Sequence, residues 1–253
     1  MIDWASSPDA PGAGVAILQR LMRTFDFVYS IGGTEMTKVL MPKVGFQTPA
    51  EAGTWARPLR PFRQILAGQK RNLRMAARLA RNVLWSKWPA GAPHPGWTVS
   101  EAGVEDMTAI ASLAQERPGE FFRFIERSPN ARCRLFKILE NGRKKGVFAL
   151  ARVGLQARLA GAWLEDPSAD TWKIAFQLAQ EIALRQTDAC EIVARSISAP
   201  AAAGAVGAGM RLRSRKPILF YRRQGAPASL PLDFQLVDND SFFLESGLSS
   251  FLT

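Results

Sequence analysis

One short segment near the start of the sequence has the residue types that could hold a phosphate group. Asp9-Ala10-Pro11-Gly12-Ala13-Gly14-Val15 follows a short apolar stretch and precedes apolar residues at helical spacing. The first amides of a helix lack partners within the helix and carry partial positive charge, and glycine lets an anion approach them. The Lys-Ser/Thr ending of a P-loop is absent, and Ile17 stands where a dinucleotide-binding motif has its third glycine. The pattern therefore predicts an anion-binding turn, and a plain strand-to-helix turn is the simpler alternative.

Around this turn the sequence predicts strands that alternate with helices. Trp55 to Pro61 contains two prolines and is not expected to form a central strand. One long helix is expected from Phe62 to Trp88, and the Pro- and Gly-rich residues 89–96 are expected to be a linker. In this first part the predicted strands are 2–6 and 26–31, and the predicted helices are 15–25 and 34–43, the second ending at Gly45-Phe46.

The rest of the chain predicts a fuller set of elements around one sheet. Asn141-Gly142 is a strong hairpin signal between two of the strands. The expected helices are 104–115, 120–126, 172–183 and 200–209, and the expected strands are 98–102, 133–139, 146–153, 157–164, 190–197, 218–222 and, as a last candidate, 234–237. The predicted fold class is α/β (α+β): a mixed, twisted sheet flanked by helices.

The two parts of the chain have the same order of predicted elements, which indicates an internal repeat. The first runs strand, turn, helix, strand, helix and Gly45-Phe46, and ends in Arg57-Pro58-Leu59. The second runs through the same order from Ala157 to Gly209-Met210, and ends in Lys216-Pro217-Ile218. The similarity is one of order and spacing and not of residue identity.

The first of these orders resembles the coenzyme-A-binding half of the GNAT acetyltransferase superfamily. The resemblance rests on a strand, an x-x-Gly-x-Gly turn, a helix, a strand, a helix and Gly45-Phe46. It implies that the amides of Gly12, Ala13, Gly14 and Val15 hold the pyrophosphate of acetyl-CoA or another acyl-CoA. It also implies that the pantetheine lies where two neighbouring parallel strands, 2–6 and 27–31, splay apart.

The sequence departs from the family pattern at three places. Asp9 stands where the family usually has Arg or Gln, and Met41 stands where many members have a tyrosine general acid. The family's first three strands and two helices have no counterpart before Ile2. The chain is therefore interpreted either as a fragment of a longer acetyltransferase or as a half domain that the second domain completes.

The second part resembles the whole GNAT element order from Thr98 onward, but its turn is different. Glu165-Asp166-Pro167-Ser168-Ala169-Asp170 has three carboxylates and no glycine, which would repel and crowd a pyrophosphate. This copy is predicted not to bind CoA. The predicted organisation is a tandem, with a GNAT-like half domain at 1–61, a basic helix and linker at 62–96, and a degenerate GNAT-like domain at 97–253.

Most of the net charge of +11 lies in one segment. Residues 54–96 contain nine Lys and Arg and no acid, whereas residues 1–53 have a net charge of −1 and residues 97–253 of +3. Lys70, Arg74, Arg78 and Arg81 are predicted to line one helix face. A solvated face is the simplest interpretation, an anionic membrane or nucleic acid the second, and attraction of the anionic cofactor the third. Trp85 and Trp88 would suit a membrane-interfacial helix, whereas no motif indicates sequence-specific nucleic-acid binding.

Composition and rare residues exclude several classes of protein. The 253 residues are 47% hydrophobic and 22% charged, with no apolar run long enough to cross a bilayer and no signal-peptide pattern. Cys133 and Cys190 have neither disulfide-framework nor metal-ligand spacing, and the single His94 lies in the linker. A cytoplasmic protein with no metal site is predicted.

Taken together, the sequence predicts an acyl-CoA-dependent N-acyltransferase that transfers an acetyl or longer acyl group to an amine or hydroxyl of a small molecule or peptide. No residue is identified as the general base. The alternative is a catalytically inactive GNAT-like protein with a binding or regulatory role, in which the basic helix contacts an anionic surface.

Overall fold

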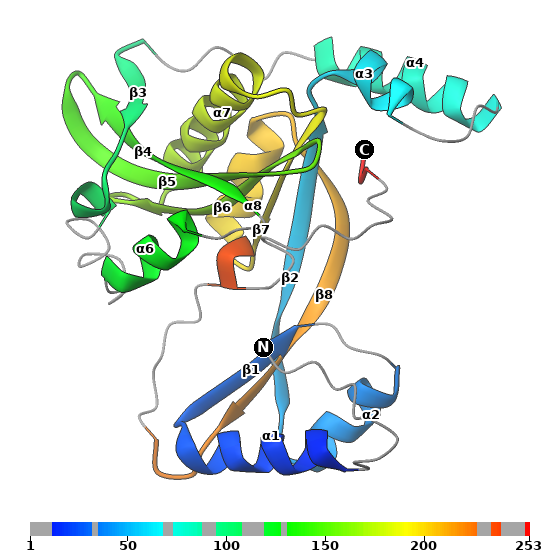
Figure 1. Cartoon of the computed structure of the whole chain (residues 1–253), viewed down its shortest axis with the longest axis vertical. Helices are drawn as coiled ribbons and strands as arrows, with labels where there is room; N and C mark the ends of the chain where they lie inside the picture. The colour runs from blue at the N-terminus through cyan, green and yellow to red at the C-terminus, as the bar shows by residue number, and fades with distance from the viewer. Residues whose placement is uncertain are drawn as a thin grey trace. The chain divides into compact units, whose positions relative to one another are not determined.

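Eight strands form one mixed sheet in the order β1-β8-β2-β7-β6-β5-β4-β3 in the computed structural model (Figure 1). The structure describes residues 12–31, 35–67, 73–87, 95–107, 119–127, 131–226, 234–238 and 251–253. The strands are β1 (Phe27–Ile31), β2 (Gln47–Pro58), β3 (Trp97–Glu101), β4 (Arg132–Glu140), β5 (Arg143–Val153), β6 (Gln156–Leu164), β7 (Glu191–Ser196) and β8 (Arg211–Arg222). The helices are α1 (Ala13–Thr24), α2 (Glu35–Lys43), α3 (Pro61–Leu66), α4 (Leu73–Lys87), α6 (Gly119–Glu126), α7 (Ala169–Gln186), α8 (Ala199–Gly207) and the short 3-10 helix η1 (Leu236–Asp238). The predicted fold class is confirmed.

The chain divides into two compact units that are not continuous in sequence. The first unit is residues 1–52 with 215–233, and the second is residues 53–214 with 234–253. Strands β2 and β8 each contribute residues to both units. The predicted tandem division, with boundaries at residues 61 and 96, describes repeated copies along the sequence, whereas the two units are defined by contacts in space. The tandem division therefore stays a prediction.

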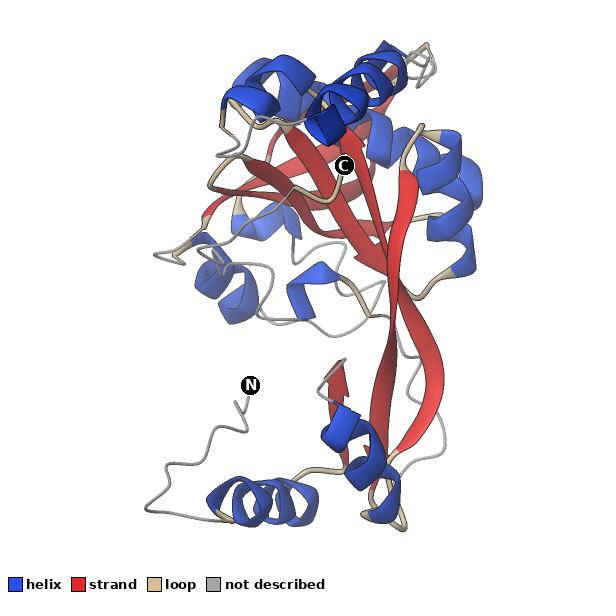
Figure 2. Ribbon diagram, turned by 90° about the vertical axis from the view of Figure 1, so that its right-hand side faces the viewer, coloured by secondary structure: helices blue, strands red, loops and turns tan. Residues whose placement is uncertain are grey.

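Helices flank both faces of the strands in the second unit (Figure 2). On one face α7 and α8 bury Trp172, Phe176 and Ala205 together with Phe136 and Phe148 of β4 and β5. On the other face α6 and η1 bury a second cluster, which is made of Phe122, Ile125, Trp163, Leu236 and Val237 among others. Antiparallel pairs link β3, β4, β5 and β6, and β6 pairs with β7 in parallel.

A smaller core holds the first unit together. Leu18 of α1, Met41 of α2, Phe46 and Leu219 of β8 are at most 4% exposed and pack together. Strand β1 pairs with β8 antiparallel, from Phe27 opposite Arg222 to Ile31 opposite Ile218.

The elements of the two halves recur at a constant separation. Strand β1 begins at residue 27 and β7 at 191, α2 begins at 35 and α8 at 199, and β2 begins at 47 and β8 at 211, each pair 164 residues apart. Both α2 and α8 end at a glycine with a left-handed backbone, Gly45 (φ 95°) and Gly209 (φ 75°). The next amide donates to the carbonyl five residues earlier in both, Phe46 to Met41 and Met210 to Ala205. Order and length thus repeat without residue identity.

Each repeated strand pairs with a strand of the other half, β1 with β8 and β2 with β7, and the two pairs have the same register. Phe27 pairs with Arg222 in the first unit, and the residues 164 positions away from each, Glu191 and Pro58, pair in the second unit. The proline motifs do not correspond as the sequence comparison had aligned them, because Pro58 lies 164 residues before Arg222 and not before Pro217. The correspondence of the halves therefore rests on register and not on these prolines.

Three expectations about the elements were wrong, and two of them concern strands. Residues 47–58 form strand β2 between β7 and β8, although a central strand was not expected there. The prolines are tolerated because Pro58 is the last residue of the strand and Pro61 lies beyond it, as the first residue of α3. Residues 234–238 form a single bridge and a 3-10 turn and not a full strand.

The expected single helix from Phe62 to Trp88 is two helices, α3 and α4. The Nδ2 of Asn82 donates to Oε1 of Gln64 at 2.9 Å, and both side chains are buried. In one straight helix these residues would lie about 27 Å apart. Lys70, the first of the four residues predicted to line the basic helix face, lies outside the described residues.

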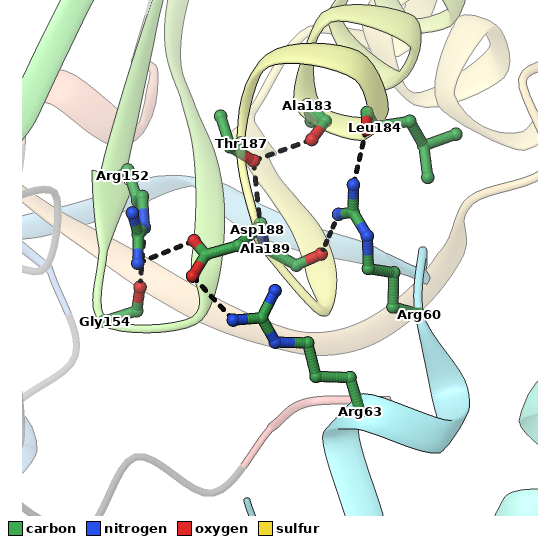
Figure 3. A network of polar contacts seen from close by, with 9 residues as sticks. All are labelled: Arg60, Arg63, Arg152, Gly154, Ala183, Leu184, Thr187, Asp188 and Ala189. Carbon is green, nitrogen blue, oxygen red and sulfur yellow. Dashed lines mark hydrogen bonds and ion pairs between the residues drawn. The ribbon is translucent and has the colours of Figure 1, made fainter.

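A polar network fixes α3 against the end of α7 (Figure 3). The carboxylate of Asp188 pairs with Arg63 of α3 at 2.8 Å and with Arg152 of β5 at 2.6 Å. Arg60 donates to the carbonyl oxygens of Ala189, at 2.6 Å, and of Leu184. Arginine at the carboxyl end of a helix satisfies carbonyls that have no helical partner, which gives α7 a defined end.

Candidate cofactor site

The predicted phosphate-binding turn forms the amino end of α1. Gly12 is the N-cap and has a left-handed backbone with φ 83°, which residues with a Cβ rarely adopt. No atom lies within 4 Å of the position that a Cβ would take at Gly12, so the turn is open on that side. Gly14 is buried, and Val15 is 39% exposed.

Nothing in the described part of the chain neutralises the amino end of α1. The N-cap makes no side-chain hydrogen bond, and no acid lies in the first turn. No described residue accepts a hydrogen bond from the amides of Ala13, Gly14 or Val15, and the first such bond of the helix is Ala16 to Gly12 at 3.0 Å. These three N–H groups and the helix dipole could bind a phosphate group.

Other predicted features of this site are only partly tested. Residues 27–31 form the predicted strand β1, which pairs with β8 in antiparallel, whereas residues 2–6, its predicted parallel neighbour, and Asp9 lie outside the described residues. Met41, at the position of the family's tyrosine, is 1% exposed and packs with Leu18, Phe46 and Leu219. Its side chain belongs to the core, so it takes no part in proton transfer.

The corresponding turn before α7 is already satisfied by its own side chains. The N-cap Ser168 accepts a hydrogen bond from the amide of Thr171, and Asp170 lies in the first turn. Asp166 accepts from the amide of Ser168 at 3.2 Å and from its hydroxyl at 2.8 Å. An arriving phosphate would meet carboxylates and a capped amide, which supports the prediction that this copy does not bind CoA.

Strands β6 and β7 splay apart in the second unit. They pair in parallel only from Gln156 opposite Glu191 to Leu159 opposite Ala194, although β6 continues to Leu164. A bulge begins at this point, because Ala149 and Leu150 of β5 face Gly161 and Leu159, which leaves Ala160 as the extra residue. The bend of β6 at this bulge accompanies the loss of pairing with β7.

Gln235 fills the opening between these strands. Its Nε2 donates to the carbonyl of Ala162 at 2.9 Å, and its Oε1 accepts from the amide of Ala162 at 2.7 Å. Its backbone forms a bridge with Ser196 of β7, and Leu236 and Val237 are buried beside it. In the family that the sequence resembles, the pantetheine lies at such a splay. Sequence reasoning missed Gln235, because a lone glutamine between apolar residues is no signal for a plug.

Two residues of the predicted basic face, Arg78 and Arg81, line a pocket in the structure. Arg78 and Arg81 lie on α4 and line a pocket with Arg213, and Arg74 also lies on α4. Trp85 is 2% exposed and its Nε1 donates to the carbonyl of Gly209 at 2.8 Å, so it is not available to a membrane interface. Among the described residues no helix is long and apolar enough to span a bilayer.

Burial raises the pKa of both cysteine thiols, that of Cys133 to about 12. Both cysteines are free. In the described ranges no group of three or more His, Cys, Asp or Glu could hold a metal ion.

Comparison with known proteins identifies the fold. No protein-family model matches the sequence, and no curated protein matches it. Among solved structures, a GCN5-related N-acetyltransferase from Anabaena variabilis is similar to 83% of this chain over 50% of its own length, with a TM-score of 0.52 and 11% identity. Another from Kribbella flavida covers 85% of this chain and 76% of its own, with a TM-score of 0.51 and 12% identity. The Saccharomyces cerevisiae N-myristoyltransferase with bound myristoyl-CoA covers 85% and 57%, with a TM-score of 0.50 and 9% identity.

These similarities show that the chain has the GNAT fold. It spans about half the length of the first of these structures. Because the identities are 9 to 12%, the fold is what they share.

Proposed function

We propose that this chain, whose fold is that of the GNAT acyltransferases, is an acyl-CoA-dependent N-acyltransferase that transfers an acetyl or longer acyl group to an amine or hydroxyl. The observation that carries the proposal is the amino end of α1. Three amides there have no described acceptor, and a left-handed glycine leaves the turn open. No comparable anion site remains before α7. Ser168 and Asp166 already accept hydrogen bonds from amides there, and the carboxylates of Asp166 and Asp170 would repel a phosphate.

The cofactor site is assigned to Gly12, Ala13, Gly14 and Val15 in the first half. These residues fit a pyrophosphate, since the helix presents N–H groups and no carboxylate in its first turn. Acyl-CoA, when bound, supplies an acyl group activated as a thioester. The chain then has to hold acceptor and donor together and in line, which can account for much of the rate of a direct transfer. A cytoplasmic location and a tandem arrangement of GNAT-like copies belong to the same proposal.

The test is calorimetric titration of CoA into the wild type and into Val15→Glu. Val15 is 39% exposed, so the new side chain can be accommodated without rebuilding the core, and its carboxylate lies beside the three amides. A negative charge in the first turn favours the helix by a few tenths of a kcal/mol, so loss of binding would not reflect unfolding. We expect CoA binding to weaken by about tenfold or more.

Ala169→Glu is the matched control. Ala169 is the first residue of α7 and is exposed, so this variant adds the same charge at the corresponding helix end of the other half. It should bind CoA as the wild type does. Equal binding by the wild type and Val15→Glu, or no saturable binding at all, would contradict the proposal.

A second candidate is a GNAT-like protein that binds CoA but transfers nothing. It is favoured by Met41, which is buried in the core at the position of the family's general acid. CoA binding with no release of free thiol from acetyl-CoA, over a panel of amine acceptors, would support it.

A further inference from the structure

Three arginines from two elements line one pocket in the second unit, and a fourth lies beside them. Arg78 and Arg81 come from α4, and Arg213 comes from the start of β8. The pocket has a volume of about 530 Å³, and Ala77 and the segment Phe251–Thr253 complete its lining. Arg211, two residues before Arg213, places its guanidinium 4.7 Å from the centre of the Trp85 ring.

Hydrogen bonds to an asparagine side chain and to main-chain oxygens hold two of these arginines in place. Arg81 donates from Nε and Nη2 to Oδ1 of Asn82 at 3.1 and 2.9 Å. Arg78 donates to the carbonyl oxygen of Phe251 at 2.6 Å and to a main-chain oxygen of Thr253, the last residue of the sequence. Across the described ranges no Asp or Glu side chain forms an ion pair with any of the four arginines.

The nearby buried carboxylate has other partners. Glu191 is fully buried and accepts from Gln156 and from the amide of Leu252 on one oxygen. Its other oxygen accepts from the amide and the hydroxyl of Thr253. Glu191 therefore holds the segment Phe251–Thr253, which lines the pocket, and both of its carboxylate oxygens already accept hydrogen bonds.

The crowding of like charges is unfavourable without an anion. Desolvation, and then repulsion by Arg213, Arg78 and Arg211, lower the pKa of Arg81, which nevertheless remains a cation at neutral pH. Elsewhere the chain pairs such groups, since Asp188 lies between Arg63 and Arg152. An anion in the pocket would relieve the repulsion.

We propose that this pocket binds the phosphate group of a small phosphorylated compound, such as pyrophosphate or a mononucleotide. Guanidinium groups donate in a planar fork that matches phosphate oxygens, which is why arginine is favoured in phosphate sites. The volume lies in the range of small-ligand sites, and Phe251, Leu252 and Ala77 give an apolar wall for the rest of the compound. The proposal does not depend on the function of the α1 turn.

The test is calorimetric titration of pyrophosphate and of AMP, at about 150 mM salt so that general attraction to the basic chain is screened. Arg213→Ala and Arg81→Ala should each weaken binding by about 10- to 100-fold. Arg213 is exposed and Arg81 bonds only to its neighbour Asn82 among the described residues, so both variants should fold.

Arg185→Ala is the matched control, because it removes one charge from an arginine side chain that is 75% exposed on α7. It should leave binding unchanged. Equal weakening by all three variants, or no saturable binding by the wild type, would overturn the proposal. So would a single-stranded oligonucleotide that binds more tightly than AMP and is weakened equally by all three variants.

Titration of CoA separates this pocket from the α1 turn, because CoA also carries phosphates. If Val15→Glu abolishes CoA binding and Arg213→Ala abolishes AMP binding only, both sites stand. If Arg213→Ala abolishes CoA binding and Val15→Glu does not, the pocket stands and the cofactor assignment to α1 is wrong. If no variant affects AMP, the pocket proposal fails whatever CoA does.

Discussion

The amino ends of α1 and α7 precede the same order of elements but differ in their N-caps and in the charge of their first turns. Each follows a turn and leads into a strand and a helix that recur 164 residues apart. At α1 the N-cap is a left-handed glycine with no side chain and no acid in the first turn. At α7 the N-cap is a serine that satisfies an amide, with Asp166 and Asp170 beside it. The two helix starts therefore differ in the side chain at the N-cap and in the charge of the first turn.

Gln235 lies at the point where β6 and β7 separate in the second half. Gln235 makes two hydrogen bonds to the backbone of Ala162 and bridges to Ser196. The second half thus uses its own chain to satisfy groups that an open cleft would leave to water or a ligand. In this half, residues of the chain itself therefore lie beside the point where β6 and β7 separate.

The largest expected effect is that of Gln235→Ala. The amide and carbonyl of Ala162 would lose their partners in a buried place, which should lower the free energy of unfolding by about 2–4 kcal/mol. Urea denaturation followed by circular dichroism measures this. Gln19→Ala, on the exposed face of α1, should change stability by less than about 0.5 kcal/mol. A Gln235→Ala protein as stable as the control would show that the plug is not a structural element.

Next in size are the two helix-ending glycines. Gly45→Ala and Gly209→Ala both force a Cβ into a left-handed backbone, at φ 95° and 75°, and each should cost about 1–2 kcal/mol. Similar losses in urea denaturation would support the equivalence of α2 and α8. If one variant were neutral and the other severely destabilised, the correspondence of the halves would be limited to element order.

Ser168→Ala has the smallest expected effect. Loss of the N-cap should cost about 1 kcal/mol, and the matched variant Ser198→Ala, which removes the cap of α8, should cost about the same. Neither variant should gain CoA binding, since Asp166 and Asp170 remain beside the α7 turn. Saturable CoA binding by Ser168→Ala in calorimetry would mean that the serine, and not the carboxylates, closes the second site.

Much of the fold was predictable, because hydrophobic period and turn residues are local. The hairpin at Asn141-Gly142, the helix α7 and the turn at Gly45-Phe46 follow from such signals. Strand β2 was missed because two prolines argued against a central strand, and only the register shows that Pro58 lies at its last paired position. The break between α3 and α4 was missed because both helices carry apolar residues at the same period.

The candidate site divides in the same way. The glycines of the α1 turn could be identified from the sequence, because their spacing and the following helix are local features. The plug by Gln235 could not be, since it joins residues 73 positions apart through one side chain. Nor could the pocket that combines Arg81 with Arg213, which depends on how α4 and the start of β8 lie together.

The most direct test of which half holds the cofactor is hydrogen–deuterium exchange with and without saturating CoA. We expect slower exchange in peptides covering residues 12–16, whose amides would bind the pyrophosphate. We expect no change in peptides covering residues 160–171, because Gln235 bonds to Ala162 and carboxylates lie beside Ser168. Protection at Ala162 and around Ser168, with none at the start of α1, would contradict the assignment of the cofactor to α1.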